Sequence, residues 1–146
     1  MATALDANVL LRLAHKEHPL HLVSRNAVLK MQAEGETLCY LPQNIVECWN
    51  VLTRPAASRG GFGLTPTQAD RQLRVLERFL ILLPDNSEVH LEWRHLVVQH
   101  GISGVQVHDA RIAACLRVHR IARLLTFNTK DFTRYSGFVT VDPENI

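Results

Sequence analysis

The sequence Ala2-Thr3-Ala4-Leu5-Asp6-Ala7-Asn8-Val9-Leu10-Leu11 contains both signals of an α/β unit. Its first four residues form a short, mainly apolar stretch, which favours a buried strand. Asp6 ends that stretch, and the apolar residues after Asn8 are spaced as in a helix. We therefore expect a strand that runs directly into a helix, with an acid at the junction.

The rest of the chain continues this alternation, without an internal repeat or an interdomain linker. Further strands are expected at residues 37–41, 80–83, 123–126 and 138–141. Helices are expected from Pro19 to just before Gly35, from Pro42, from Pro66 behind the cap Thr65, from Asn86 or Ser87 to Gly101, and from Val107. Strands that alternate with helices predict an α/β sandwich on a mostly parallel sheet.

The composition is that of an ordinary globular protein. Of the 146 residues, 47% are hydrophobic and 21% are charged, which excludes a disordered tail, a collagen-like repeat and a small disulfide scaffold. No apolar run approaches the roughly 18–20 residues of a membrane helix, and no export signal is recognisable. The three cysteines lie far apart, as buried residues of a reducing compartment do. We expect a cytoplasmic protein without a membrane partner.

Most of the basic residues are arginines. The net charge is only +2, but 13 of the 16 basic residues are arginine. Arginine binds phosphate with two parallel hydrogen bonds, so this bias favours phosphate recognition. A compositional bias of the genome explains the same count, and composition alone leaves the choice open.

Several polar residues stand where a parallel sheet binds ligands, at the carboxyl ends of its strands. Asp6 follows the first strand, Glu47 lies on the helix after the second, and Asp109 opens a later helix. Asn128 and Asp131 follow the strand that ends at Thr126. Each has a simpler interpretation: Asp6 as a helix cap, Glu47 as an exposed glutamate, Asp109 as a partner of the helix dipole, and the last two as turn formers.

The joint placement of these residues is more informative than any one of them. Carboxylates that cluster repel one another unless they are protonated or share a cation. A site rich in oxygen atoms suits a hard divalent ion, and we expect Mg²⁺ or Mn²⁺. Such ions activate water and stabilise charge on a phosphoryl group, which is the chemistry of phosphodiester hydrolysis.

Four segments in this order resemble those of PIN domains, and most of all the VapC toxins of toxin–antitoxin pairs. They are Leu5-Asp6-Ala7-Asn8-Val9-Leu10-Leu11, the helix that carries Glu47, His108-Asp109-Ala110-Arg111-Ile112-Ala113-Ala114, and Leu125-Thr126-Phe127-Asn128-Thr129-Lys130-Asp131-Phe132. The resemblance covers nearly the whole chain. It implies a single PIN-like domain over residues 1–146, with an α/β/α sandwich.

The resemblance also implies an activity and partners. The activity is that of an endoribonuclease dependent on Mg²⁺ or Mn²⁺, which hydrolyses RNA and acts as the toxin of a pair. The partners are the RNA substrate, a cognate antitoxin of the VapB type and a second copy of the chain in a homodimer. Neither the RNA that is cut nor the number of metal ions follows from the sequence.

The family's site residues carry over by position. Asp6, Glu47 and Asp109 correspond to the three core acids that hold the metal. The fourth family position falls on Asn128, a weaker ligand than aspartate, and Asp131 stands one helical turn further on, where it can supply the missing charge. We expect Asp131 in the catalytic group with the three core acids.

Two further residues are expected to orient the acids rather than to bind metal. Asn8 and Thr126 are hydrogen-bonding side chains beside Asp6 and Asn128 in the sequence. The competing hypothesis for the whole chain is a PIN-like module that binds RNA or protein without catalysis, which the asparagine at position 128 favours. A phosphotransfer domain is a third possibility, but Ala7 and Asn8 stand where such domains usually carry a second acid.

Overall fold

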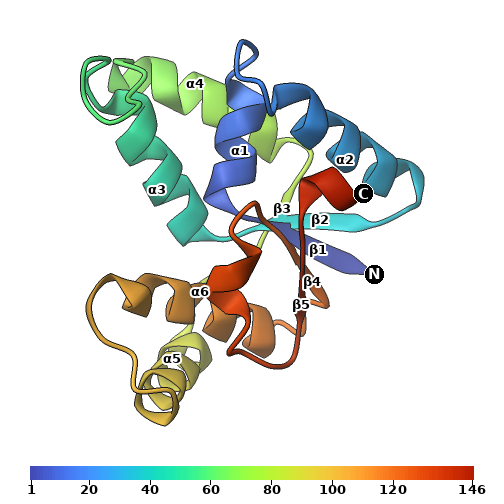
Figure 1. The fold of residues 1–146 in the computed structure, drawn as a ribbon, viewed down its shortest axis with the longest axis vertical. Helices are drawn as coiled ribbons and strands as arrows, with labels where there is room; N and C mark the ends of the chain where they lie inside the picture. The colour runs from blue at the N-terminus through green and yellow to red at the C-terminus, as the bar shows by residue number, and fades with distance from the viewer.

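A single parallel sheet forms the centre of the computed structural model, which describes residues 1–146. The strands are β1 (Ala2–Leu5), β2 (Thr37–Tyr40), β3 (Ile81–Leu82), β4 (Arg123–Leu125) and β5 (Val139–Val141). Their order across the sheet is β3-β2-β1-β4-β5, and every neighbouring pair is parallel (Figure 1). The predicted α/β sandwich is confirmed, and the sheet is parallel throughout.

Helices cover both faces of the sheet. They form two groups, one on each face of the sheet (Figure 1). The first group is α1 (Ala7–Ala14), α2 (His21–Ala33), α3 (Pro42–Thr53) and α4 (Pro66–Glu77); the second is α5 (Ser87–Gln99) and α6 (Val107–Val118). None of these helices is long and apolar enough to cross a membrane.

Alternation along the strands divides the core into two apolar clusters. Leu5 and Leu125 belong to the cluster under α1 to α4, whereas their neighbours Ala4 and Leu124 belong to the cluster under α5 and α6. Successive side chains of a strand point to opposite faces, so a central strand of a sheet covered on both faces is mainly apolar on both sides. This is why β1 and β4 lack the polar alternation of an exposed strand.

The helix boundaries follow from local chemistry. Thr65 accepts a hydrogen bond from the Gln68 N–H, and the Gln68 side chain accepts one from the Thr65 N–H, so the predicted capping box is present. Asn86 caps α5 through the Val89 N–H. Helix α2 begins at His21 rather than at Pro19, because His18 holds the Leu20 N–H in a turn before the helix.

Three short 3-10 helices were not expected from the sequence: η1 (Gly104–Gln106), η2 (Thr129–Phe132) and η3 (Pro143–Asn145). Each is a single turn, too short for a hydrophobic period to appear. The most important is η2, because it follows β4 and carries Asp131.

The glycine-rich loop after α3 folds back onto that helix. The Phe62 and Leu64 N–H groups donate to the carbonyl oxygens of Val51 and Leu52, at 3.2 and 2.9 Å. Gly61 is required, because a Cβ atom there would lie 2.4 Å from the carbonyl oxygen of Pro55. The loop therefore packs against its own helix instead of projecting over the edge of the sheet.

Candidate active site

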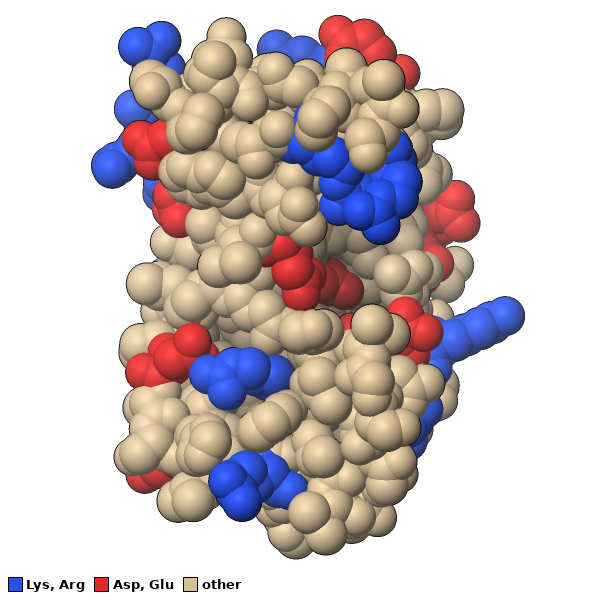
Figure 2. Space-filling view, turned by 90° about the vertical axis from the view of Figure 1, so that its left-hand side faces the viewer, with Lys and Arg blue, Asp and Glu red and all other residues tan.

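The three central strands bring the predicted acids to one edge of the molecule. Asp6 directly follows strand β1, and the neighbouring strands β2 and β4 lead into the segments that carry Glu47 and Asn128. Figure 2 looks onto this edge: acidic side chains gather in a hollow at its middle, and basic side chains stand above and below it. Such a charge pattern suits a ligand that carries both phosphate and bound cations.

Asp6 is buried at the bottom of the site. The residue is only 6% exposed to solvent. Oδ1 accepts a 2.7 Å hydrogen bond from the Ala7 N–H, and Oδ2 accepts one of 2.8 Å from the Thr126 hydroxyl. Burial raises the pKa of Asp6 and these two hydrogen bonds oppose the rise. Asp6 is thus the cap of α1 and a member of the acidic group at once.

Thr126 fixes the position of Asp6. Besides donating to Asp6, its hydroxyl oxygen accepts from the Asn8 side-chain amide at 3.1 Å and from the Asn128 N–H at 3.0 Å. Asn8 in turn accepts from the Phe127 N–H at 3.2 Å. The structure therefore supports the expectation that both residues orient the acids, with Asn8 acting through Thr126.

Glu47 projects from α3 toward the same hollow and is partly buried. Burial is the main cause of its raised pKa, and the charge of Asp6 adds to it. Gln43, one turn earlier on α3, donates a 2.8 Å hydrogen bond to Glu47 Oε1 and opposes the rise. Gln43 was not among the predicted site residues; its only signal in the sequence is the spacing of four residues from Glu47, which places both on one face of a helix.

Asp109 gives the clearest electrostatic evidence for a cluster. Burial raises its pKa to about 6, and the charges of Asp131, Asp6 and Glu47 contribute in that order. Burial alone raises the pKa of a carboxylate, and like charges nearby raise it further. The contributions of Asp131, Asp6 and Glu47 indicate that these three acids lie on the same side of the molecule as Asp109.

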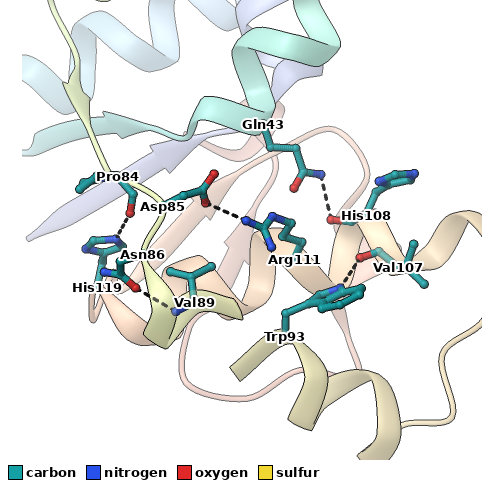
Figure 3. Close-up of polar contacts among 10 residues, drawn as sticks. All are labelled: Gln43, Pro84, Asp85, Asn86, Val89, Trp93, Val107, His108, Arg111 and His119. Atoms are coloured by element: carbon teal, nitrogen blue, oxygen red, sulfur yellow. Dashed lines mark hydrogen bonds and ion pairs between the residues drawn. The ribbon is translucent and has the colours of Figure 1, made fainter. Parts of the chain in front are cut away.

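The start of α6, which carries Asp109, is held from three directions (Figure 3). The Trp93 indole N–H donates to the carbonyl oxygen of Val107 at 2.9 Å. Arg111 forms a 3.3 Å ion pair with Asp85, in the segment after β3. The Gln43 amide reaches the carbonyl oxygen of His108 at 2.9 Å. Asp109 is thus presented by a fixed backbone.

Asn128 and Asp131 lie at the outer side of the site, on and before η2. Asn128 precedes the 3-10 helix and its side chain makes no capping hydrogen bond. Both residues line one surface hollow with a volume of about 390 Å³, together with Phe127, Thr129, Lys130 and Asp142. The arrangement places both candidates for the fourth position at the site and does not choose between them.

The donor set fits a hard divalent cation in its chemistry. Its ligands are carboxylate oxygens, and their mutual repulsion is what a bound cation relieves. The side chains are not gathered into a ready coordination group, since no three His, Cys, Asp or Glu side chains are close enough to hold a metal ion.

Comparison with known proteins agrees with the fold. No protein family model matches the sequence, and no curated protein matches it. Among solved structures, the chain is similar to a chain of VapBC2 from Rickettsia felis bound to a promoter DNA fragment (TM-score 0.70, 18% identity, 97% of this chain and 98% of that one). It is also similar to VapBC-1 from nontypeable Haemophilus influenzae (TM-score 0.68, 20% identity, 98% of both chains).

A third solved structure is described as a toxin. This is VapC20 from Mycobacterium tuberculosis, described as a toxin that cleaves the sarcin–ricin loop (TM-score 0.63, 12% identity, 92% of this chain and 97% of that one). At these identities the likeness concerns the fold. The chain has the PIN-like α/β fold of VapC proteins, and the resemblance found in its sequence motifs is confirmed at that level.

Proposed function

We propose that this chain is a divalent-metal-dependent endoribonuclease and the toxin of a toxin–antitoxin pair. The observation that carries the proposal is the placement of four acids: Asp6 directly follows β1, Glu47 lies on the helix after β2, and Asp109 and Asp131 line one cavity. Structural or surface acids are usually paired with a cation or exposed singly, whereas this group lies in one hollow at the ligand-binding edge of a parallel sheet.

Each residue has a distinct part in the proposed reaction. Asp6, Glu47 and Asp109 would hold Mg²⁺ or Mn²⁺, which activates water and stabilises the phosphoryl charge. Thr126 and Gln43 keep Asp6 and Glu47 in place through their hydrogen bonds. Asp131, with Asn128 beside it, completes the negative rim on the side of η2. The buried floor at Asp6 keeps bulk water away from one side of the site.

Thermal unfolding tests the metal site first. Wild type and Asp6→Asn are unfolded in EDTA and in millimolar Mn²⁺. A ligand that binds only the folded state stabilises it by about 2.7 kcal/mol at one hundred times its Kd. We expect Mn²⁺ to raise the wild-type midpoint and to leave Asp6→Asn nearly unchanged. Asp70→Asn is the matched control, because Asp70 forms only an exposed ion pair with Arg74 on α4.

Cleavage of single-stranded and structured RNA tests the activity itself. We expect wild type to cut RNA with Mn²⁺ or Mg²⁺, and Asp6→Asn and Asp109→Asn to lose several orders of magnitude in rate while Asp70→Asn keeps it. Wild type that is folded and metal-bound, but cuts no RNA faster than Asp6→Asn does, contradicts the proposal.

The alternative is a PIN-like module that binds RNA or protein without catalysis. Asn128 at the fourth position favours it, as does the lack of a ready coordination group. Such a module would gain no stability from Mn²⁺, and its wild type would cut RNA no faster than Asp6→Asn does. The same two experiments therefore separate the alternatives.

An antitoxin partner is part of the proposal, and one surface supports it. An apolar groove of about 330 Å³ runs between α1, α2 and the end of α4, and exposed Leu29 and Phe79 line it. Large apolar side chains exposed together in a groove are typical of a docking site for an amphipathic helix. Several similar structures are toxin–antitoxin complexes, one of them from Klebsiella pneumoniae.

Co-purification with a co-expressed antitoxin tests that groove. Phe79→Glu should abolish the complex. Val98→Glu is the control, because Val98 is 82% exposed on α5, on the other face of the sheet. Equal recovery of the complex with both variants would exclude the groove as the contact. The homodimer is proposed from the resemblance alone, and light scattering of the purified chain tests it.

A further inference from the structure

A small cavity lies beside Asp109, and neither Glu47 nor Asp6 lines it. Its volume is about 70 Å³, which is the scale of one phosphate group rather than of a base. It is lined by Gln106, Asp109, Lys130, Asp131, Arg134 and Tyr135. Asp109 is a ligand of the proposed metal site, and Asp131 lies on its rim. The other four residues lie in η1 and in or just after η2. None of these four was predicted as a site residue from the sequence.

Both cations of this cavity are free. The chain forms five ion pairs, and neither Lys130 nor Arg134 takes part in any of them. This is so although Asp109 and Asp131 line the same cavity. By contrast, Arg111 forms an ion pair with Asp85, and Arg117 forms one with Glu92. The positive charge of Lys130 and Arg134 is therefore available to an external anion.

Tyr135 contributes a hydroxyl group that no other residue holds. Its ring is buried and packs edge-on against His100, with the ring centroids 5.4 Å apart. Burial raises the pKa of Tyr135, the charge of Arg134 opposes the rise and that of Asp109 adds to it. Arg134 and Asp109 line the same cavity as Tyr135. The rigid ring thus presents an O–H donor to the cavity.

We infer that this cavity is a subsite for a backbone phosphate of the RNA substrate, bound by Lys130 and Arg134 with the Tyr135 hydroxyl. The inference rests on the proposed ribonuclease function and adds residues to it. Carboxylates without a bound cation repel a phosphate, so cations beside them are needed to hold the RNA chain against the acidic hollow. The short helix η2 then contributes both to the acidic group, through Asp131, and to phosphate binding, through the adjacent Lys130.

Binding of a short single-stranded RNA in EDTA tests the subsite without cleavage. A fluorescent ten-nucleotide RNA is titrated with wild type, Lys130→Gln and Arg134→Gln at several salt concentrations. We expect each variant to bind about tenfold more weakly, because a charged contact to phosphate is lost. The slope of log affinity against log salt should become less steep by about 0.7 for each contact removed.

Arg78→Gln is the matched control. Arg78 is exposed, forms no ion pair and lies just before β3, at the opposite edge of the sheet from the acids. It removes the same charge, so it corrects for the change in net charge. If Arg134→Gln and Lys130→Gln match Arg78→Gln in affinity and in salt slope, the subsite is overturned.

Two further measurements separate this inference from the proposed function. Tyr135→Phe keeps the ring against His100, so it should keep the unfolding midpoint and weaken RNA binding severalfold. Wild type that cuts RNA while all three variants bind normally refutes the subsite alone. Wild type that neither binds nor cuts RNA refutes the proposed function, and the subsite with it.

Discussion

The side-chain amide of Gln43 lies 2.9 Å from the carbonyl oxygen of His108, 65 positions away in the chain (Figure 3). The same nitrogen also donates to Glu47 at 2.8 Å. One amide group therefore joins α3 to the start of α6, and these are the elements that carry Glu47 and Asp109. The spacing between two acids of the cluster depends on a residue with no charge.

Replacing Gln43 by alanine should weaken metal binding. The change leaves Glu47 without its hydrogen-bond donor and removes the link to α6, and partners that orient metal ligands are typically worth about 10- to 100-fold in affinity or activity. The measurement is the Mn²⁺ concentration needed to raise the unfolding midpoint, together with the rate of RNA cleavage.

Gln99→Ala is the control for that experiment, since Gln99 is an exposed residue at the end of α5. A purely structural role for Gln43 would lower the midpoint in EDTA and leave the Mn²⁺ dependence unchanged. That result would remove Gln43 from the site.

Replacing Thr126 by valine should destabilise the protein and reduce activity. Valine has the shape of threonine, but it leaves Asp6 without a donor and the Asn8 amide and Asn128 N–H without an acceptor. Thr126 is fully buried, so a loss of about 1–3 kcal/mol in the free energy of unfolding is expected. Urea unfolding measures it.

Thr126→Ser keeps the hydroxyl and should restore most of the stability and the activity. The pair of variants therefore separates the hydrogen bonds from the shape of the side chain. Equal losses in serine and valine would mean that packing of the methyl group, not the hydroxyl network, is what matters at this position.

The fold could be predicted from the sequence because the signals that begin and end its elements are local. The acid after β1, the capping box at Thr65 and the prolines that begin α3 and α4 each act within a few residues. The acids of the proposed site could be predicted because parallel strands bring their carboxyl ends to one edge. Gln43 and the cavity beside Asp109 depend on contacts between distant segments, for which one sequence gives no pattern.

The buried acids should make the metal-free protein less stable as pH rises. The pKa of Asp109 is about 6 when folded, against 3.8 for an ordinary aspartate, so the folded state holds more protons between these values. The stabilising contribution of the protonated group is complete below pH 3.8 and is lost as pH rises through about 6. The free energy of unfolding in EDTA should fall across this range.

Asp109→Asn removes this contribution, and the variant should show a shallower fall between pH 4 and pH 6. Urea unfolding at closely spaced pH values in EDTA gives the comparison. Asp6 and Glu47, whose pKa values are also raised, keep part of the slope in the variant. Identical pH profiles for wild type and Asp109→Asn would show that Asp109 does not titrate in this range.

Replacing Asn128 by aspartate tests whether position 128 supplies the fourth ligand of the proposed metal site. The new carboxylate would stand beside Asp131 on the same hollow, so it should lower the midpoint in EDTA by repulsion and increase the rise produced by Mn²⁺. Asn26→Asp adds the same charge on α2 and should leave the Mn²⁺ response unchanged. A Mn²⁺ response in Asn128→Asp no larger than in wild type would assign the fourth role to Asp131, because an added carboxylate at a true ligand position must strengthen the binding of a divalent cation.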